Sequence, residues 1–389
     1  MNSGNVMPRD VAPDVLRGFA LLGILVVNIP FMALNSQDGA HGTWVQGMAN
    51  GSAGFIMLSL FAGKFYILFS FLFGYSASYI IKDDRANRPR WAKRSLALLG
   101  LGVLHFSFLW HGDILFLYGL MGLMLIPFLF RTEKTLKIWI RIIFILFSTI
   151  LIIACTSFIV GERLFPDEFK EQFSAQSRLD EVMLGGTFLE SVMPRIELWV
   201  FGLIGGIFLQ GGFVFAAFLL GLKAGRRKVL SGSFENLNLS RMLKLGLILG
   251  LPMQITAATI FVRNEQLESP SEAIYFASVA AAFISAPLLT MAYVALILRM
   301  IKRSPSLVAW LRPAGKMSLT LYISQSLIAS LIFAPWGLGL FQEVDLWGVM
   351  LIAGAIWLFL VLVATNVLKK YKQGPIEAVV HRLTARKST

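Results

Sequence analysis

Long apolar runs separated by short polar segments dominate the chain. A helix that crosses the apolar core of a bilayer needs about 20 mostly apolar residues, and ten stretches approach that length and composition. They are roughly 18–34, 54–81, 95–110, 113–130, 142–160, 198–222, 245–261, 273–298, 317–333 and 346–368. The pattern predicts an all-α polytopic membrane protein with about ten transmembrane helices.

The polar segments between these runs carry basic residues in alternation. Of the 35 Lys and Arg residues, 29 fall in the odd-numbered segments and 5 in the even-numbered ones, and Lys64 lies inside the second run. The acidic residues show the opposite bias, with 7 in odd and 15 in even segments. Because cytoplasmic loops retain an excess of Lys and Arg, both termini are expected in the cytoplasm.

Composition agrees with this class and excludes others. The 389 residues are 56% hydrophobic and only 15% charged, with a mean hydropathy of +0.70, whereas a soluble domain carries about 25% charged residues. A single cysteine, Cys155, excludes a disulfide scaffold. The net charge of +13 follows the loop alternation, so we expect membrane lipid and no nucleic acid as a partner. No small-residue cleavage site follows the first run, which is therefore expected to remain as an anchor.

Residues 1–370 are expected to form one transmembrane bundle, and two segments stand apart from its spans. The acidic outer loop 161–197 contains Pro166 and phenylalanines at 165, 169 and 173, a spacing that predicts a short helix serving either as a lid or as a cover for the loops. The tail 371–389 places Ile376, Val379, Val380 and Leu383 at helical spacing among basic residues. It is predicted to be a basic amphipathic helix on the cytoplasmic lipid surface.

Glycine pairs four residues apart are expected to allow close contact between helices. The pairs are Gly202 with Gly206 and Gly246 with Gly250. Small residues at this spacing let two helix backbones approach inside a membrane, so packing is the expected role of both pairs.

Ionisable groups at membrane depth are costly and therefore indicate candidate functional positions. His105 and Asp113 flank the tight outer turn between the third and fourth runs, and Tyr118 follows Asp113 by five residues. His105 is a candidate general base, which Asp113 could orient. A histidine held only by hydrogen bonds between helices is the competing interpretation, and Asp113 could equally be a helix cap.

Other candidates lie on the first two runs. Asp14 and Arg17 stand three apart at the cytoplasmic end of the first run, either as a structural ion pair or as a fork that holds a phosphate or carboxylate. Asn28 is a polar group near the outer end of the same run, and His41 follows in the outer loop. Lys64, in the outer half of the second run, needs a carboxylate, a wet cavity or a route to the interface.

A polar stripe runs along the ninth span. Ser318, Tyr322, Gln325, Ser326 and Ser330 share one helical face. The stripe could line a tunnel, or it could supply hydrogen bonds between helices at about 0.6 kcal/mol each. The sequence contains no phosphate-binding loop, no nucleophile elbow and no Cys/His metal spacing, so we expect no metal site and no ATP-driven transport.

Several blocks that together cover nearly the whole chain form a specific combination. They are 14–24 with 27–29, 69–74, Leu104-His105 with 112–115 and Tyr118, 315–320 through Gln325-Ser326, and 374–377. In these blocks the sequence resembles the YeiB-like family of bacterial membrane proteins of unassigned function. The resemblance implies a location in the bacterial inner membrane.

The Leu16-Arg17-Gly18 opening is also similar to that of membrane-embedded acyltransferases such as heparan glucosaminide acetyltransferase. That similarity implies acyl-CoA bound from the cytoplasm as co-substrate and an acceptor, a glycan or lipid, at the outer face. It implies that Asn28 and His41 lie at the site of acyl transfer. His105 and Asp113, the ionisable pair at membrane depth, are further candidates for the catalytic residues. Asp14, Arg17 and Lys316 are then expected to bind the cofactor, and Lys64, Tyr118, Tyr322 and Gln325 to line the substrate cavity.

Two other functions stay open at this stage. Ten spans divided five and five would give halves of opposite topology, which some secondary transporters of small anions or metabolites use. A non-catalytic membrane scaffold would instead satisfy its polar groups internally without a cavity. The sequence does not indicate the oligomeric state.

Overall fold

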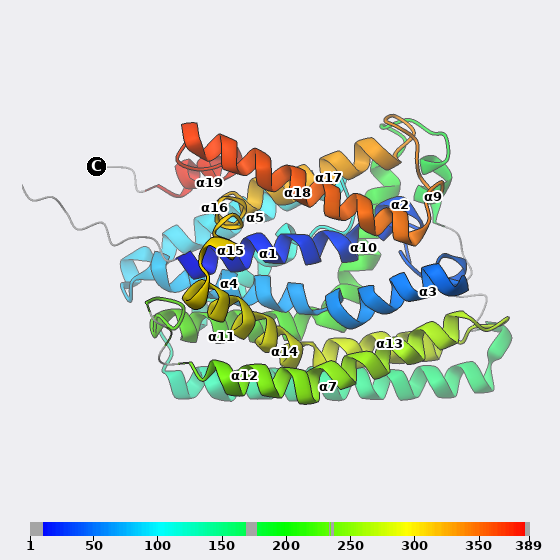
Figure 1. The fold of residues 1–389 in the computed structure, drawn as a ribbon, viewed down its shortest axis with the longest axis horizontal. Helices are drawn as coiled ribbons and strands as arrows, with labels where there is room; N and C mark the ends of the chain where they lie inside the picture. The colour runs from blue at the N-terminus through cyan, green and yellow to red at the C-terminus, as the bar shows by residue number, and fades with distance from the viewer. Residues whose placement is uncertain (1–10, 169–176, 233, 235–236, 386–389) are drawn as a thin grey trace, which may run out of the picture.

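The computed structural model describes residues 11–168, 177–232, 234 and 237–385, and in these ranges every regular element is a helix. Most of the long helices run along the longest axis of the molecule, some in each direction (Figure 1). In chain order the helices are α1 Val11–Asn28, α2 Pro30–Ala33, α3 Gly47–Ile56, α4 Lys64–Ile81, α5 Arg88–Phe108, α6 Leu115–Met124, α7 Glu133–Leu164, α9 Arg178–Met183, α10 Val192–Gly206, α11 Gly212–Arg226, α12 Leu239–Leu245, α13 Leu251–Glu265, α14 Glu272–Arg303, α15 Ser306–Ala309, α16 Arg312–Lys316, α17 Ser318–Phe333, α18 Leu346–Lys370 and α19 Pro375–Thr384.

Seven helical segments of the described chain are long and apolar enough to cross a membrane. They are Val11–Asn28, Gly47–Ile81, Glu133–Leu164, Val192–Arg226, Leu239–Glu265, Glu272–Arg303 and Leu346–Lys370. The remaining three expected spans also contain helices: α5, whose first turns are basic, and the shorter apolar helices α6 and α17. The fold is therefore all-helical, with several helices typical of a membrane protein.

Helix ends differ from the expected span boundaries for local reasons. α5 begins at Arg88 rather than near 95, because Pro89 suits the first helical turn and the basic residues that follow continue the helix. α6 ends at Met124, and a 3₁₀ turn with Pro127 follows it. Proline lacks the N–H that an α-helix would use, so this helix is shorter than the apolar run that predicted it.

The second apolar run is broken rather than continuous. After α3, a π-helical segment Met57–Phe61 leads to Gly63, whose φ of +80° is a conformation that glycine adopts without steric cost. α4 then starts at Lys64. Hydropathy does not detect such a break, because the residues on both sides of it are apolar.

Glycines set the closest helix contacts in the bundle. A Cβ at Gly315 of α16 would lie 1.7 Å from the Asp14 carbonyl oxygen of α1, and one at Gly74 of α4 would lie 2.1 Å from the Phe218 carbonyl oxygen of α11. These two pairs of helices therefore touch backbone to backbone.

One of the two predicted glycine pairs also packs in this way. Virtual Cβ atoms at Gly246 and Gly250 would meet α14 at under 3 Å, so this pair brings the two helices together as expected. For Gly202 and Gly206 the expectation of packing is wrong within the described chain. A Cβ at Gly202 would meet nothing within 4 Å, and one at Gly206 would meet only the side chain of Gln210.

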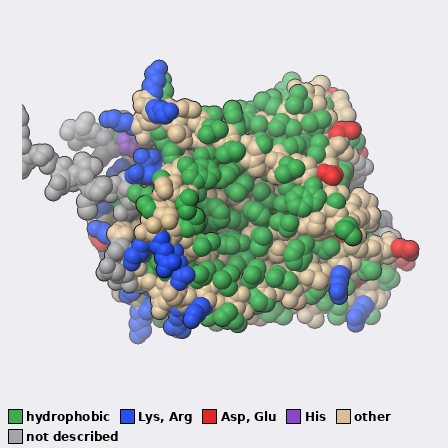
Figure 2. Space-filling model, viewed as in Figure 1, with side chains coloured by type: hydrophobic (Ala, Val, Ile, Leu, Met, Phe, Trp, Pro, Cys, Tyr) green, Lys and Arg blue, Asp and Glu red, His purple; other side chains and the backbone are tan. Residues whose placement is uncertain are grey.

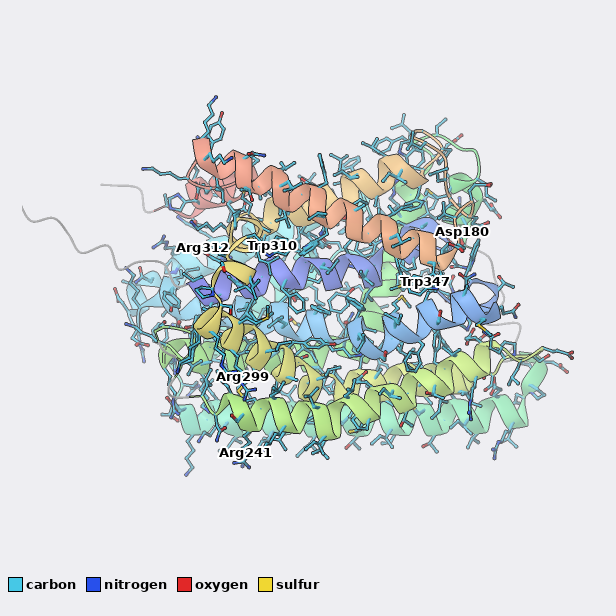
Figure 3. The ribbon with its side chains drawn as sticks, in the orientation of Figure 1. Asp180, Arg241, Arg299, Trp310, Arg312 and Trp347 are labelled. Carbon is cyan, nitrogen blue, oxygen red and sulfur yellow. The ribbon has the colours of Figure 1, made fainter. Side chains whose placement is uncertain are left out.

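The charges separate toward the two ends of the bundle. In Figure 2, a broad hydrophobic band separates an end rich in Lys and Arg from an end that carries most of the acidic groups seen on this face together with some basic side chains. Figure 3 places the labelled Arg241, Arg299 and Arg312 toward the first end and Asp180 with Trp347 toward the second. An apolar band between polar ends is the surface expected of a bilayer-embedded protein.

The tail forms the predicted helix and also docks on the bundle. Glu377 of α19 accepts hydrogen bonds from the backbone N–H groups of Leu319 and Thr320, at 2.7 and 3.1 Å, and so caps the first turn of α17. Val379 and Leu383 stay exposed on α19, in keeping with the expected apolar face. The helix expected after Pro166 in the outer loop falls mostly in 169–176, outside the described residues.

Candidate functional site

His105 is the centre of a buried polar cluster at the C-terminal end of α5. Its Nδ1 lies 2.8 Å from Oδ1 of Asp113, and its Nε2 lies 2.9 Å from Oγ of Ser326 on α17. The three residues are 2%, 9% and 4% exposed. The side chains expected to pair across the outer turn are therefore in contact, and a serine 221 residues away completes a linear array.

Local structure holds this array in place. Oδ2 of Asp113 accepts the Phe116 N–H at 2.7 Å, which caps α6, so the carboxylate serves both as helix cap and as partner of His105. The Tyr322 ring packs 5.1 Å from the His105 ring, and its hydroxyl accepts the Ile114 N–H at 3.2 Å. Both interpretations of Asp113 that the sequence allowed are thus present together.

A second polar chain begins at Asn28 near the end of α1. Tyr66 of α4 donates a short hydrogen bond to Oδ1 of Asn28. The Tyr118 hydroxyl lies 3.3 Å from the Tyr66 carbonyl oxygen and 2.7 Å from Oγ of Ser70. Asn28 and Tyr118 are therefore joined through α4, whereas Tyr322 rather than Tyr118 packs against His105.

A cavity of about 60 Å³ lies between α1, α4, α5, α6 and α17. Tyr118 and Tyr322, two of the residues predicted to line the substrate cavity, line it together with Arg17 and Arg94. Nε of Arg94 is buried without a hydrogen-bond partner among the described residues, and its guanidinium lies 5.5 Å from the Phe73 ring. A buried donor left unpaired is uncommon in folded proteins and asks for an explanation, such as a ligand in the cavity.

The expected cofactor-binding residues lie around the same region. Asp14 accepts a 3.3 Å bond from Arg17, which also approaches the Leu72 carbonyl oxygen at 3.4 Å. Lys316 ends α16 two residues before Ser318, a residue of the cavity wall, but is not itself part of that wall.

Lys64 and Gln325 do not line this cavity. Gln325 donates to the Leu21 carbonyl oxygen at 3.2 Å. Lys64 is fully buried at the break before α4, where Nζ donates to the Leu58 carbonyl oxygen at 2.6 Å and to Oε1 of Gln254. Both of these partners of the amine are neutral, whereas the sequence led us to expect a carboxylate, a wet cavity or a route to the interface.

His41 belongs to a different cluster at the acidic end of the molecule. Its Nε2 lies 3.5 Å from Oε1 of Glu265 and 3.7 Å from Oε2 of Glu272, and Tyr275 stacks on its ring. Burial lowers the pKa of His41 to about 4 in spite of these carboxylates, so it is neutral near pH 7. Its described contacts are with α13 and α14 rather than with the His105 array.

Three functional candidates could not be assigned from the sequence. Arg94 counted as one of six basic residues in a cytoplasmic loop, and Tyr66 stood in an apolar run with no polar neighbour to mark it. Ser326 belongs to the polar stripe of the ninth span, but the stripe did not indicate that His105 is its partner. Within the described ranges no group of three or more His, Cys, Asp or Glu side chains is arranged to hold a metal ion.

The fold and this site define the class: an α-helical membrane protein with a histidine-centred polar array buried between its helices. Residues 224–387 match a family model described as "Protein of unknown function (DUF418)". The chain is 27% identical to uncharacterized protein YeiB of Escherichia coli over 98% of this chain and 97% of that protein. It is 25% identical to uncharacterized protein YxaH of Bacillus subtilis over 94% of this chain and 91% of that protein.

These matches confirm the resemblance to the YeiB-like family. The names of these relatives state no activity, and the comparisons do not show the similarity to acyltransferases that the Leu16-Arg17-Gly18 opening led us to expect. No solved structure matches the chain.

Proposed function

We propose that the protein is a membrane acyltransferase that moves an acyl group from cytoplasmic acyl-CoA to a glycan or lipid hydroxyl at the outer face. One observation carries the proposal. The same cavity is lined by two arginines, Arg17 and Arg94, and by Tyr322, whose ring packs on His105. Anion-binding side chains thus border a cavity whose Tyr322 wall packs directly against the candidate base.

The spacing of these residues along two helices gives the site its depth. Arg17 precedes Asn28 by eleven residues on α1, and Arg94 precedes His105 by eleven on α5. At 1.5 Å per residue each pair spans about 16 Å along its helix. Both arginines lie nearer the basic ends of their helices, so a donor that enters there has its reactive end directed toward Asn28 and His105.

The proposal assigns a role to each group. Arg17, oriented by Asp14, and Arg94 hold phosphate or carbonyl oxygens of the donor, because guanidinium groups suit planar and bidentate recognition of such oxygens. Lys316 adds positive charge at the cytoplasmic mouth. His105 accepts the proton of the attacking hydroxyl at Nε2, and Asp113 orients its ring.

The size of the cavity limits what enters it. Pockets that bind small molecules usually measure about 300–1,000 Å³. This cavity measures about 60 Å³ and is therefore too small to hold a nucleotide. We therefore place the nucleotide of CoA at the cytoplasmic surface and only the thioester end inside, with the pocket widening as it binds.

The membrane arrangement that we propose has ten spans with both termini in the cytoplasm of a bacterial inner membrane. The loop charges support it, since 29 of 35 basic residues lie in the odd-numbered segments, at the end that is basic in Figure 2. α5, α6 and α17 supply the three spans beyond the seven long apolar helices.

Acetyl-CoA binding to purified protein in lipid nanodiscs tests the proposal, with Arg94→Gln as the variant and Lys93→Gln as its matched control. Lys93 is the neighbouring cation, is exposed, and lies outside the cavity wall. A hydrogen bond to a charged group contributes about 1.5–3 kcal/mol, so we expect binding to weaken about 10- to 100-fold in Arg94→Gln and to hold in Lys93→Gln. Failure of the wild type to bind acetyl-CoA or palmitoyl-CoA, or equal weakening in both variants, contradicts the proposal.

A secondary transporter is the second candidate, and the broken helix at Lys64 favours it. Discontinuous helices with a polar group at the break often mark transporter sites, and this lysine is fully buried. Uptake of a small anion into proteoliposomes, dependent on a proton gradient and lost in Lys64→Met, supports this function over acyl transfer. Absence of uptake by the wild-type protein removes this function, and uptake that Lys64→Met leaves unchanged removes the role of the lysine.

A further inference from the structure

The geometry of Ser326, His105 and Asp113 points to a covalent step, and we propose that Ser326 is a nucleophile that carries the acyl group as an ester. This inference rests on the proposed acyl transfer and deepens it by naming the first acceptor. The three side chains have the order of a hydrolase triad, with 2.9 Å between the serine oxygen and Nε2 and 2.8 Å between Nδ1 and the carboxylate.

The neighbours of the two ring nitrogens give them different roles. One oxygen of Asp113 accepts the Phe116 N–H, and the other lies 2.8 Å from Nδ1 of His105. An ionised carboxylate has no proton to donate, so Nδ1 carries the ring proton and Nε2 presents its lone pair to the Ser326 hydroxyl. That tautomer lets histidine take the serine proton.

The surroundings can also stabilise the negative charge that forms on the acyl oxygen. The Tyr322 hydroxyl accepts the Ile114 N–H, which leaves its own proton free to be donated. The Trp110 ring lies 6.4 Å from His105, and its buried indole N–H has no acceptor among the described residues. These two donors next to His105 are the groups that we assign to an oxyanion site.

Position along α17 links the serine to the donor cavity. Ser326 follows Tyr322 by four residues, one helical turn, and Tyr322 forms part of the cavity wall. A thioester that reaches Tyr322 is therefore one turn from Ser326. In the proposed reaction the donor approaches from the cytoplasmic face of the membrane and the acceptor from the outer face. An acyl group held on Ser326 passes from one to the other without both being bound at the same time.

The reaction balances in two steps. In the first, the Ser326 proton moves to Nε2 of His105, the serine oxygen bonds to the thioester carbonyl carbon, the carbon–sulfur bond breaks, and the CoA sulfur takes the proton. In the second, an acceptor hydroxyl gives its proton to Nε2 and bonds to the same carbon, and the Ser326–acyl bond breaks as the serine oxygen recovers the proton. Neither step involves an oxidation or a reduction.

The test is mass spectrometry of the wild-type protein in nanodiscs after incubation with each of two acetyl donors. Acetyl-CoA requires the proposed cofactor site, whereas p-nitrophenyl acetate requires only the nucleophile. We expect one acetyl group on the peptide that contains Ser326. It should be absent in Ser326→Ala, retained in Ser330→Ala, which removes a buried serine one turn further along α17, and restored as a thioester in Ser326→Cys.

The outcomes separate this inference from the proposed function. Acetylation of Ser326 by p-nitrophenyl acetate but not by acetyl-CoA keeps the nucleophile and removes the acyl-CoA donor. Consumption of acetyl-CoA at an equal rate by wild type and a folded Ser326→Ala keeps acyl transfer and overturns the nucleophile. Absence of an adduct with both donors, or an adduct on another residue, also overturns it.

Discussion

Substituting Asp113 by Asn separates its role as helix cap from its role toward His105. The carboxylate uses one oxygen for the Phe116 N–H at 2.7 Å and the other for Nδ1 of His105 at 2.8 Å. An amide has one oxygen, so if it stays on the cap, the NH₂ group faces Nδ1. His105 must then accept at Nδ1 and carry its proton at Nε2, where the serine needs a lone pair.

The expected magnitudes follow from this exchange. Replacing a hydrogen bond to a charged group by a neutral one costs about 1–2 kcal/mol of stability, whereas a tautomer error of this kind costs about 10⁴-fold in rate. We therefore expect Asp113→Asn to fold, with a slightly lower melting temperature, and to acylate Ser326 at least 10³-fold more slowly than wild type. The assay is the rate of p-nitrophenol release in detergent, beside a melting curve.

Asp345 provides a matched control. It also caps a helix through its side chain, accepting the Gly348 N–H at 2.7 Å, but at an exposed position. Asp345→Asn should change neither the rate nor the melting temperature noticeably, because asparagine caps as well as aspartate. A folded Asp113→Asn that keeps the wild-type rate refutes the assigned tautomer and with it the role of His105 as base.

Two further predictions concern stability. Burial and the nearby charge of Asp180 raise the pKa of Asp38 to about 6, so its ionisation destabilises the fold as pH rises from about 4 through 6. Asp38→Asn should stabilise the protein by about 1–2 kcal/mol at pH 7.5 and by almost nothing at pH 4. A difference in melting temperature between variant and wild type that does not vary with pH would contradict the raised pKa of Asp38. Gly315→Ala should destabilise by about 2 kcal/mol or more, because its Cβ would lie 1.7 Å from the Asp14 carbonyl oxygen, whereas Gly354→Ala, with nothing within 4 Å, should be neutral or stabilising. Equal melting temperatures for the two glycine variants would show that α1 and α16 are not in backbone contact.

That the protein is an all-helical membrane protein could be predicted from the sequence, because this class depends on average hydropathy and on loop charge. These quantities tolerate errors of several residues at each boundary. The break before Lys64 was not accessible, since a glycine with positive φ and a π-helical segment leave no trace in hydropathy. Helix continuity is decided by local backbone geometry that apolar side chains do not encode.

The candidate site was accessible where its partners lie close in sequence. His105 and Asp113 flank one tight turn, so an antiparallel pair of helices brings them together. Ser326 and Arg94 required the packing of α17 and α5 around the cavity. A polar stripe or a basic loop has many solvated or packing explanations, and only three-dimensional proximity selects among them.

The partners of Lys64 differ from those that the sequence led us to expect. Burial of a charged group in a membrane demands compensation, which led us to expect a carboxylate or water. The structure instead supplies a carbonyl oxygen and the Gln254 amide oxygen. Two acceptors match the two N–H groups of a neutral amine, whereas a protonated amine has three to satisfy.

In the proposed reaction, the thioester end of acyl-CoA enters the cavity between Arg94 and Tyr322 and stops beside His105. A cryo-EM structure of the protein in nanodiscs with a non-hydrolysable thioether analogue of acetyl-CoA tests this placement. We expect density for the nucleotide at the basic end of the bundle, with the acyl end against Tyr322. A saturated sample whose cavity holds no analogue, or one that binds it only at the acidic end, would exclude the proposed path of the donor.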